Sequence, residues 1–125
     1  MAKYASFEDL EVYKATIEFT IEIFELLKKE KFKKEWIFTD QLKRATLSIS
    51  NNIAEGFERE TDKELIRFLY FSKGSAGEVR NIINVLKTVK YITLDEEDNL
   101  KNMISGISKQ LSNYIKYVKK RNDFS

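Results

Sequence analysis

Polar side chains recur between residues 41 and 59 at the spacing of one helical face. Intervals of three and four residues place such side chains on one side of a helix, and the strip comprises Gln41, Arg44, Ser48, Asn52, Glu55 and Arg59. Glu78 lies near the edge of an apolar stripe on the next predicted helix and is a candidate partner for the strip. Paired carboxylates such as Glu55 and Glu78 can perform acid–base chemistry or bind a metal ion.

Three interpretations of this strip stay open. It can be a polar seam that admits a neighbouring helix and satisfies the polar groups along the contact. It can be a metal or catalytic site built from Asn52, Glu55 and Glu78, or a surface that contacts RNA or protein. The residues assigned to the polar seam are Gln41, Ser48, Asn52, Glu55 and Glu78.

The absence of certain residue types limits the chemistry. The sequence has no cysteine, which excludes disulfides and thiolate metal sites, and no histidine, the commonest general base and metal ligand. Carboxylate metal sites in helical bundles normally recruit histidine. The sequence also has no phosphate-binding glycine loop and no nucleophile elbow. We therefore predict no enzyme activity, no catalytic residue, no metal site and no cofactor.

The elements that must position these residues are helices. The 125 residues include no proline and only 4 glycines, which favours a few long helices with short connections. Helix start signals occur at Thr39-Asp40 and at Thr93, and Thr61 with Glu64 forms a capping box. The predicted helices span about 7–29, 39–58, 62–89 and 94–120 in a single domain, 1–125. We expect an all-α fold, an antiparallel up-down-up-down four-helix bundle.

Apolar stripes predict which helical faces form the core. In the helix predicted over 7–29, one series with helical spacing comprises Leu10, Tyr13, Ile17, Ile21, Phe24 and Leu27. The next helix carries Leu42, Ala45, Ile49, Ile53 and Phe57. The third carries Leu65, Phe68, Leu69, Ser72, Ala76, Val79, Ile83 and Leu86. We expect each series to face the centre of the bundle.

The helix predicted over 62–89 has more apolar surface than one bundle core can cover. The consecutive residues 68–71 point in four directions around the helix, and Phe71, Ile82 and Val89 share a shoulder beside the core stripe. Gly74 and Gly77 each cost roughly 1 kcal/mol relative to alanine, which is easiest to explain if another backbone comes close. We predict a ring-like homo-oligomer with the candidate interface Tyr70, Phe71, Gly74, Gly77, Ile82 and Val89.

The charge balance and the N-terminus bear on partners and location. The net charge of +2 is lower than is usual for a nucleic-acid binder, so such a role would need local clustering or multiplication in an oligomer. Residues 1–14 lack the apolar run of a signal peptide, and no stretch is apolar enough to span a membrane. We expect a cytoplasmic protein without membrane contact.

Three segments of the sequence resemble a known family. They read SFEDLEVYKATIEFT, TDQLKRATLSISNNIAEGFERE and KELIRFLYFSKGSAGEVRNII. They are similar to the bacterial four-helix-bundle proteins called the 23S rRNA-intervening-sequence (ribosomal-like) family, over roughly residues 6–92. That family has a proline within S-I-P-x-N where this chain has Ser50.

The resemblance implies a four-helix bundle that assembles into a ring, commonly a pentamer, and a link to RNA. Genes of the family often lie inside insertions in large-subunit ribosomal RNA. A related accessory protein of diversity-generating retroelements is a basic pentameric barrel that partners a reverse transcriptase and nucleic acid. For most members of the family the molecular role is not established.

Two functions follow from these observations. The first is an oligomeric accessory protein that binds structured RNA through a basic face, with the candidate contacts Lys43, Arg44, Arg59, Lys63, Arg67, Lys73 and Arg80. The alternative is a protein–protein scaffold that docks a partner without contacting nucleic acid. Nearby acids such as Glu58, Glu60 and Asp62 dilute the basic patch, so these residues can also form an ordinary solvated face.

Overall fold

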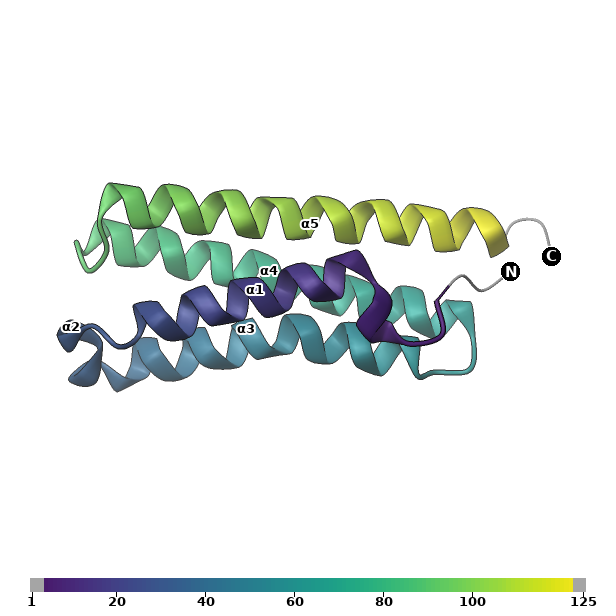
Figure 1. Cartoon of the computed structure of the whole chain (residues 1–125), viewed down its shortest axis with the longest axis horizontal. Coiled ribbons are helices and arrows are strands. Elements are labelled where there is room, and N and C mark those ends of the chain that lie inside the picture. Colours follow the sequence, from purple (N-terminus) through teal and green to yellow (C-terminus); the bar gives the residue numbers. More distant parts are fainter. Residues whose placement is uncertain (1–3, 123–125) are drawn as a thin grey trace.

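Residues 4–122 are described by a computed structural model, and they form an all-helical bundle (Figure 1). These residues contain one short 3-10 helix, η1, and five α-helices. The bounds are η1 (Phe7–Asp9), α1 (Glu11–Leu26), α2 (Glu30–Lys33), α3 (Trp36–Phe57), α4 (Asp62–Thr88) and α5 (Leu94–Asn122). None of these helices is long and apolar enough to cross a membrane.

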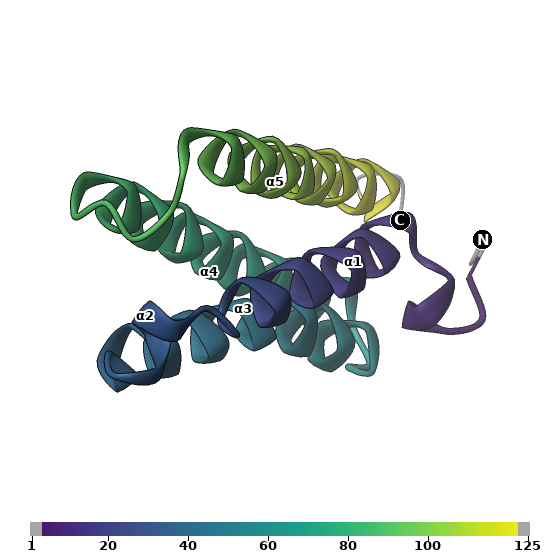
Figure 2. The ribbon, with the colours of Figure 1, turned by 60° about the vertical axis from the view of Figure 1, so that its left-hand side comes forward.

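The four long helices lie side by side along the long axis of the molecule, and the chain turns back between successive helices (Figures 1 and 2). Helices α3 and α4 have the most extensive contact, followed by α4 and α5. Helix α1 packs against both α3 and α5. Each long helix therefore has two neighbours, and α1 and α4 occupy opposite corners of the bundle.

The helix boundaries in the N-terminal third of the chain differ from those predicted from the sequence. Leu10 is extended, with φ −70° and ψ 132°, and separates η1 from α1. The predicted helix over 7–29 is therefore too long at both ends, because α1 spans only Glu11–Leu26. The next helix begins at Trp36 and not at Thr39, whose hydroxyl donates to the Phe32 carbonyl at 3.1 Å.

The core face of α1 also differs from the prediction. The side chains buried in the bundle are Val12, Thr16, Phe19, Ile23 and Leu26. The predicted stripe instead leaves Ile17, Ile21 and Phe24 exposed, at 39%, 57% and 39% of their surface. Both series have three- and four-residue spacing, so helical periodicity alone does not distinguish them. α1 thus has a second apolar face that the other described residues, within 4–122, do not cover.

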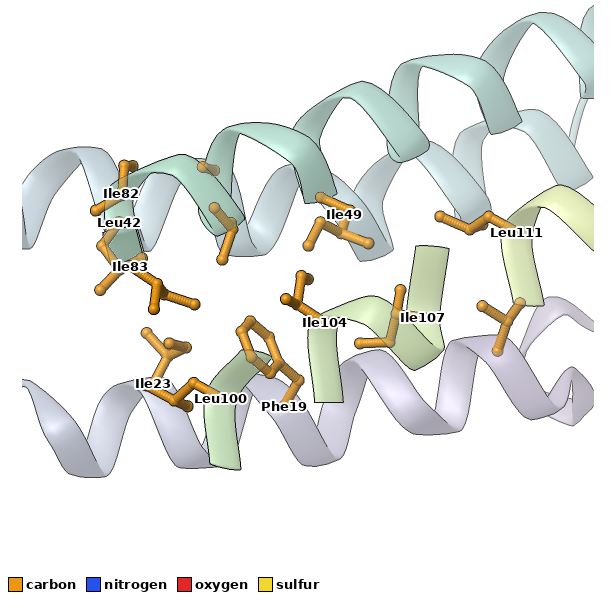
Figure 3. Close-up of a cluster of buried hydrophobic side chains, with 14 of the residues drawn as sticks. Phe19, Ile23, Leu42, Ile49, Ile82, Ile83, Leu100, Ile104, Ile107 and Leu111 are labelled. Carbon is orange, nitrogen blue, oxygen red and sulfur yellow. The ribbon is translucent and has the colours of Figure 1, made fainter. Parts of the chain in front are cut away.

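The centre of the bundle is filled by apolar side chains from all four long helices (Figure 3). Phe19 of α1, Ile49 of α3, Ile83 of α4 and Ile104 of α5 are each fully buried. The predicted stripes of the second and third helices are buried except Phe57 and Phe68, which are half-buried. Apolar burial of this kind is the main source of stability, and it fixes the rotation of α3 and α4 about their axes.

Candidate nucleic-acid interface and polar seam

A row of small polar side chains joins α3 to α4. The hydroxyl oxygens of Ser48 and Ser75 are 2.8 Å apart. The amide of Asn52 donates to the carbonyl and hydroxyl oxygens of Ser48, at 2.8 and 3.0 Å. The buried hydroxyl of Ser72 donates to the carbonyl of Ile49 at 2.7 Å. These bonds satisfy polar groups at the helix contact and give the polar seam its structural role.

Gly56 lies at the closest approach of the two helices. A Cβ atom at this position would lie 2.8 Å from Cβ of Phe68 and 3.3 Å from the carbonyl oxygen of Leu65. Glycine is a poor helix former but leaves room for the neighbouring backbone. The weak helix formers of residues 48–56 thus trade helix propensity for close packing between α3 and α4.

Three predicted members of the seam, Gln41, Glu55 and Glu78, lie outside it. Gln41 and Glu78 are exposed, and the seam bonds found in residues 4–122 involve neither. Glu55 pairs instead with Arg59, with 3.0 Å between carboxylate oxygen and guanidinium nitrogen. Glu78 is ten residues beyond Phe68, the residue that faces Gly56, which is roughly 15 Å along α4. The structure therefore does not bring the Glu55 and Glu78 carboxylates together as an acid–base pair.

Carboxylates do not cluster elsewhere in the described chain. Among residues 4–122, no group of three or more Asp, Glu, His or Cys side chains is placed to hold a metal ion. Arg44, the second residue of the predicted polar strip, pairs with Asp40 at 2.9 Å within α3. The strip is thus divided into local ion pairs at its two ends and a hydrogen-bonded seam in the middle.

Two of the candidate basic residues meet two phenylalanines at one end of the α3–α4 pair. The Arg59 guanidinium lies 4.8 Å from the ring centre of Phe68, and that of Arg67 lies 5.3 Å from Phe68 and 5.1 Å from Phe71. The two rings are themselves edge to face, 5.5 Å apart. We call Arg59, Arg67, Phe68 and Phe71 the arginine–aromatic cluster. Its guanidinium groups are held in place by the rings beneath them.

Carboxylates flank the arginine–aromatic cluster. Arg67 pairs with Glu64 at 3.3 Å, and Arg59 lies 4.0 Å from the same carboxylate in addition to its pair with Glu55. The side chains of these pairs are about half exposed to solvent, and an ion pair at a protein surface contributes on the order of 0–1 kcal/mol. An incoming phosphate can therefore compete for both guanidinium groups.

A cavity of about 230 Å³ opens beside the arginine–aromatic cluster, at the end of the bundle. Arg59, Asp62, Tyr114 and Arg121 contribute to its lining. Arg121 of α5 binds both oxygens of Asp62 through two bonds of 2.7 and 2.9 Å. These hydrogen bonds hold the pKa of the Asp62 carboxyl below its ordinary value. The pair ties the start of α4 to the end of α5 and leaves Arg59 as the more available cation of the cavity.

The remaining candidate contacts do not join one basic face. Lys63 lies one turn before Arg67 in α4, close to the cluster in sequence. Lys43 lies on the other side of α3, with its amine 5.4 Å from the ring centre of Phe24 in α1. Lys73 and Arg80 are two and nine residues after Phe71, which places them roughly 160–180° from it around α4. Sequence reasoning missed Phe68 and Phe71 as members of this site, although they follow Arg67 directly or within one turn.

The residues predicted as an oligomer interface are also divided. Ile82 has only 6% of its surface exposed and belongs to the hydrophobic core of its own bundle, which corrects its assignment to a subunit interface. Tyr70 is half exposed, but its hydroxyl accepts a hydrogen bond from Lys119 of α5 at 2.8 Å. Phe71 and Val89 remain exposed. Gly74 and Gly77 border open space, so no close backbone among residues 4–122 explains them.

Comparisons with known proteins agree on the family. The family described as 23S rRNA-intervening sequence protein matches residues 8–113. A crystal structure from Bacteroides thetaiotaomicron VPI-5482, of a protein with unknown function from the S23 ribosomal protein family, is similar with a TM-score of 0.78 and 28% sequence identity. The match covers 84% of this chain and 95% of that one. No curated protein matches the chain. Since the family match covers most of the sequence, the chain belongs to the 23S rRNA-intervening sequence protein family.

Proposed function

We propose that this protein is a non-catalytic, cytoplasmic accessory protein that binds structured RNA through the arginine–aromatic cluster and Lys63. Its unit would be an antiparallel up-down-up-down four-helix bundle, and copies would associate into a ring-like homo-oligomer, as in the pentamers that the family resemblance implies. The observation that carries the proposal is the placement of Arg59 and Arg67 over Phe68 and Phe71. The family name, which refers to ribosomal RNA, supports the same class of partner.

The chemistry of the cluster suits RNA. Guanidinium groups bind phosphate oxygens in bidentate geometry, and the rings beneath them hold the groups in place before binding. Phe71 is exposed enough to stack against an unpaired base, which is how proteins commonly recognise loops and bulges in RNA. A ring of identical subunits would repeat each phosphate contact, so a modest charge per subunit can give strong, salt-dependent binding.

The test is the affinity for a transcribed 23S rRNA stem-loop, measured by fluorescence anisotropy over a series of salt concentrations. Arg59→Glu and Lys63→Glu should each weaken binding about tenfold or more and reduce the salt dependence, because each removes a phosphate contact. Lys109→Glu is the matched control, since it makes the same charge change at an exposed position of α5. Equal losses in all three variants would contradict a localised site.

A protein–protein scaffold is the second candidate function. It is favoured by the ion pairs that already engage Arg59 and Arg67 with Glu55 and Glu64. If the wild-type protein does not bind the RNA even at low salt, the RNA proposal fails and the scaffold remains. Native mass spectrometry of protein purified from its own host would then show whether a protein partner, and no nucleic acid, accompanies it.

A further inference from the structure

The cavity beside the arginine–aromatic cluster has features that the proposed RNA site does not use. We call it the end cavity. It lies where three parts of the chain meet at one end of the bundle: the connection between α3 and α4, the last turns of α5 and the segment before η1 (Figure 1). The proposed RNA site uses only Arg59 from its lining, so the aromatic and polar groups around the rest of the cavity need an explanation of their own.

The size and the walls of the end cavity limit what it can hold. Cavities that take drug-sized molecules have volumes of about 300–1,000 Å³. The end cavity, at about 230 Å³, is smaller and suits a single planar ring system. Tyr4, Phe57 and Tyr114 all contribute to its lining. Aromatic side chains of this kind stack on nucleobases whatever their identity.

The charged groups of the lining indicate which part of a nucleotide can enter. Arg59 and Arg121 are balanced by Glu60 and Asp62, so the formal charges of the lining cancel. Arg121 is already bound to Asp62 through bonds of 2.7 and 2.9 Å. A phosphate inside the cavity would be repelled by the carboxylate of Glu60, whereas an uncharged base would not. The lining therefore favours a base inside the cavity and a phosphate outside it.

Tyr114 has a hydroxyl group that is available to such a base. Its side chain is half-buried, yet none of the hydrogen bonds found among residues 4–122 uses the hydroxyl. Burial raises the pKa of the Tyr114 phenol, so the hydroxyl stays protonated and can donate a hydrogen bond. The ring stacks on Tyr117, with 6.1 Å between ring centres and 12° between planes, which holds it in position.

Arg59 joins the end cavity to the arginine–aromatic cluster. It contributes to the lining of the cavity, and its guanidinium lies 4.8 Å from the ring centre of Phe68 in the cluster. A phosphate bound to Arg59 therefore lies beside the cavity, and only one ribose separates a phosphate from its own base. A nucleotide that is not held in a base pair can turn its base out of the stack into such a cavity.

We propose that the end cavity receives one unpaired base of the bound RNA, while Arg59 binds the adjoining phosphate. The inference rests on the proposed RNA function and adds the kind of nucleotide that the site recognises. Guanine should be preferred to uracil, because its Watson–Crick edge presents adjacent N–H donors to the carboxylate of Glu60, which only accepts hydrogen bonds. Uracil would direct carbonyl oxygens at the same group.

The first experiment titrates the protein with guanosine monophosphate and with uridine monophosphate and follows the amide signals by NMR. The signals of Gly56 and Thr61, which both line the cavity, should shift on binding. The dissociation constant should be about tenfold lower for the guanosine nucleotide, because it adds hydrogen bonds to a charged group. Inorganic phosphate should bind at least about tenfold more weakly than either nucleotide. If phosphate binds as well as the nucleotides do, the base makes no contact and the inference is overturned.

Two tyrosine substitutions test the walls of the cavity. Tyr4→Ala removes one aromatic wall and should weaken binding of guanosine monophosphate about tenfold. Tyr114→Phe keeps the ring, removes the hydroxyl and should weaken binding by about three- to tenfold. Tyr70→Ala is the matched control, because Tyr70 is 47% exposed, similar to the 37% of Tyr4, and does not line the cavity. A thermal melt of each variant shows that the fold is retained, and an equal loss in the control would contradict the assignment.

An RNA measurement distinguishes a base of the RNA from a free nucleotide as the natural ligand. Each unpaired guanosine of the 23S rRNA stem-loop is replaced in turn by an abasic residue. One replacement should weaken binding to the wild type about tenfold and binding to Tyr4→Ala very little, because that variant already lacks the contact.

The outcomes separate the inference from the function on which it rests. If the RNA binds but no abasic replacement shows this pattern, the inference is overturned and the RNA proposal stands. If the RNA does not bind at low salt while guanosine monophosphate still shifts the Gly56 and Thr61 signals, both are overturned and the cavity binds free nucleotides only. If neither the RNA nor the nucleotide binds, the cavity is not a nucleotide site and both proposals fail.

Discussion

A methyl group added at Gly56 tests the close packing of α3 against α4. Alanine would favour the helix by about 1 kcal/mol over glycine. Its Cβ, however, would lie 2.8 Å from Cβ of Phe68, where two carbons normally keep about 3.5–4.0 Å. The Phe68 Cβ is bonded directly to the backbone of α4, so the helix itself must move by roughly 1 Å.

The cost of this shift decides whether Gly56→Ala raises or lowers the free energy of unfolding. Overpacking a core contact costs about 1–3 kcal/mol, which exceeds the gain in helix propensity when the obstacle is backbone and not the end of a flexible side chain. We expect Gly56→Ala to lower the free energy of unfolding by about 1–2 kcal/mol. Urea denaturation followed by circular dichroism measures the change, with all variants at one protein concentration because association adds to the apparent stability.

Gly106→Ala provides the matched control. Apart from the two neighbouring residues and the backbone of its own helix, the same methyl group at this position of α5 meets no atom of residues 4–122 within 4 Å. It should raise the free energy of unfolding by up to about 1 kcal/mol through helix propensity alone. The two substitutions should thus have opposite signs. A Gly56→Ala protein as stable as the Gly106→Ala protein would refute the close approach described here.

Two other perturbations follow from buried polar groups. The hydroxyl oxygen of Thr46 is buried and has no hydrogen-bond partner in the described part of the chain, so Thr46→Val should raise the free energy of unfolding in urea by about 1 kcal/mol. Thr46→Ser, which keeps the hydroxyl, should give no gain. Because Arg121 lowers the pKa of Asp62 below 3.8, the pair stabilises the fold above that value and its contribution is lost as the pH falls through the lowered pKa. Acid titration should therefore show Asp62→Asn about 1 kcal/mol less stable than the wild type near neutrality and equally stable in strong acid.

The sequence predicted the core faces of α3 and α4 because each helix carries a single dominant apolar series. Ile49 and Ile83 belong to those series, and both are fully buried. Helix α1 carries two overlapping series, and the burial of Phe19 and Ile23 in place of Ile21 depends on packing against the other helices. The segment KKEKFKKE is so strongly charged that its sequence predicts a solvent-exposed connection, yet Phe32, its one apolar residue, is buried.

In the candidate site, too, the sequence predicted contacts within one helix but not contacts between two helices. Helical spacing brought Ser48 and Asn52 together on one strip, and the structure joins them by hydrogen bonds. Their partner on α4 proved to be Ser75 and not Glu78. The register of the two helices is set by the contact of Gly56 with Phe68, and a contact between helices leaves no periodic signal in either one.

The unequal helix contacts of the bundle have a consequence for how it opens. Helices α3 and α4 share the longest contact, whereas α1 is held by shorter approaches to α3 and α5. Regions with few buried contacts open first in native-state fluctuations, and their amide protons exchange soonest with solvent. Of the four long helices, α1 should therefore be the first to open. Deuterium uptake by the α1 amides should accordingly exceed uptake by the amides of α3 and α4, so α1 reports the first opening of the bundle.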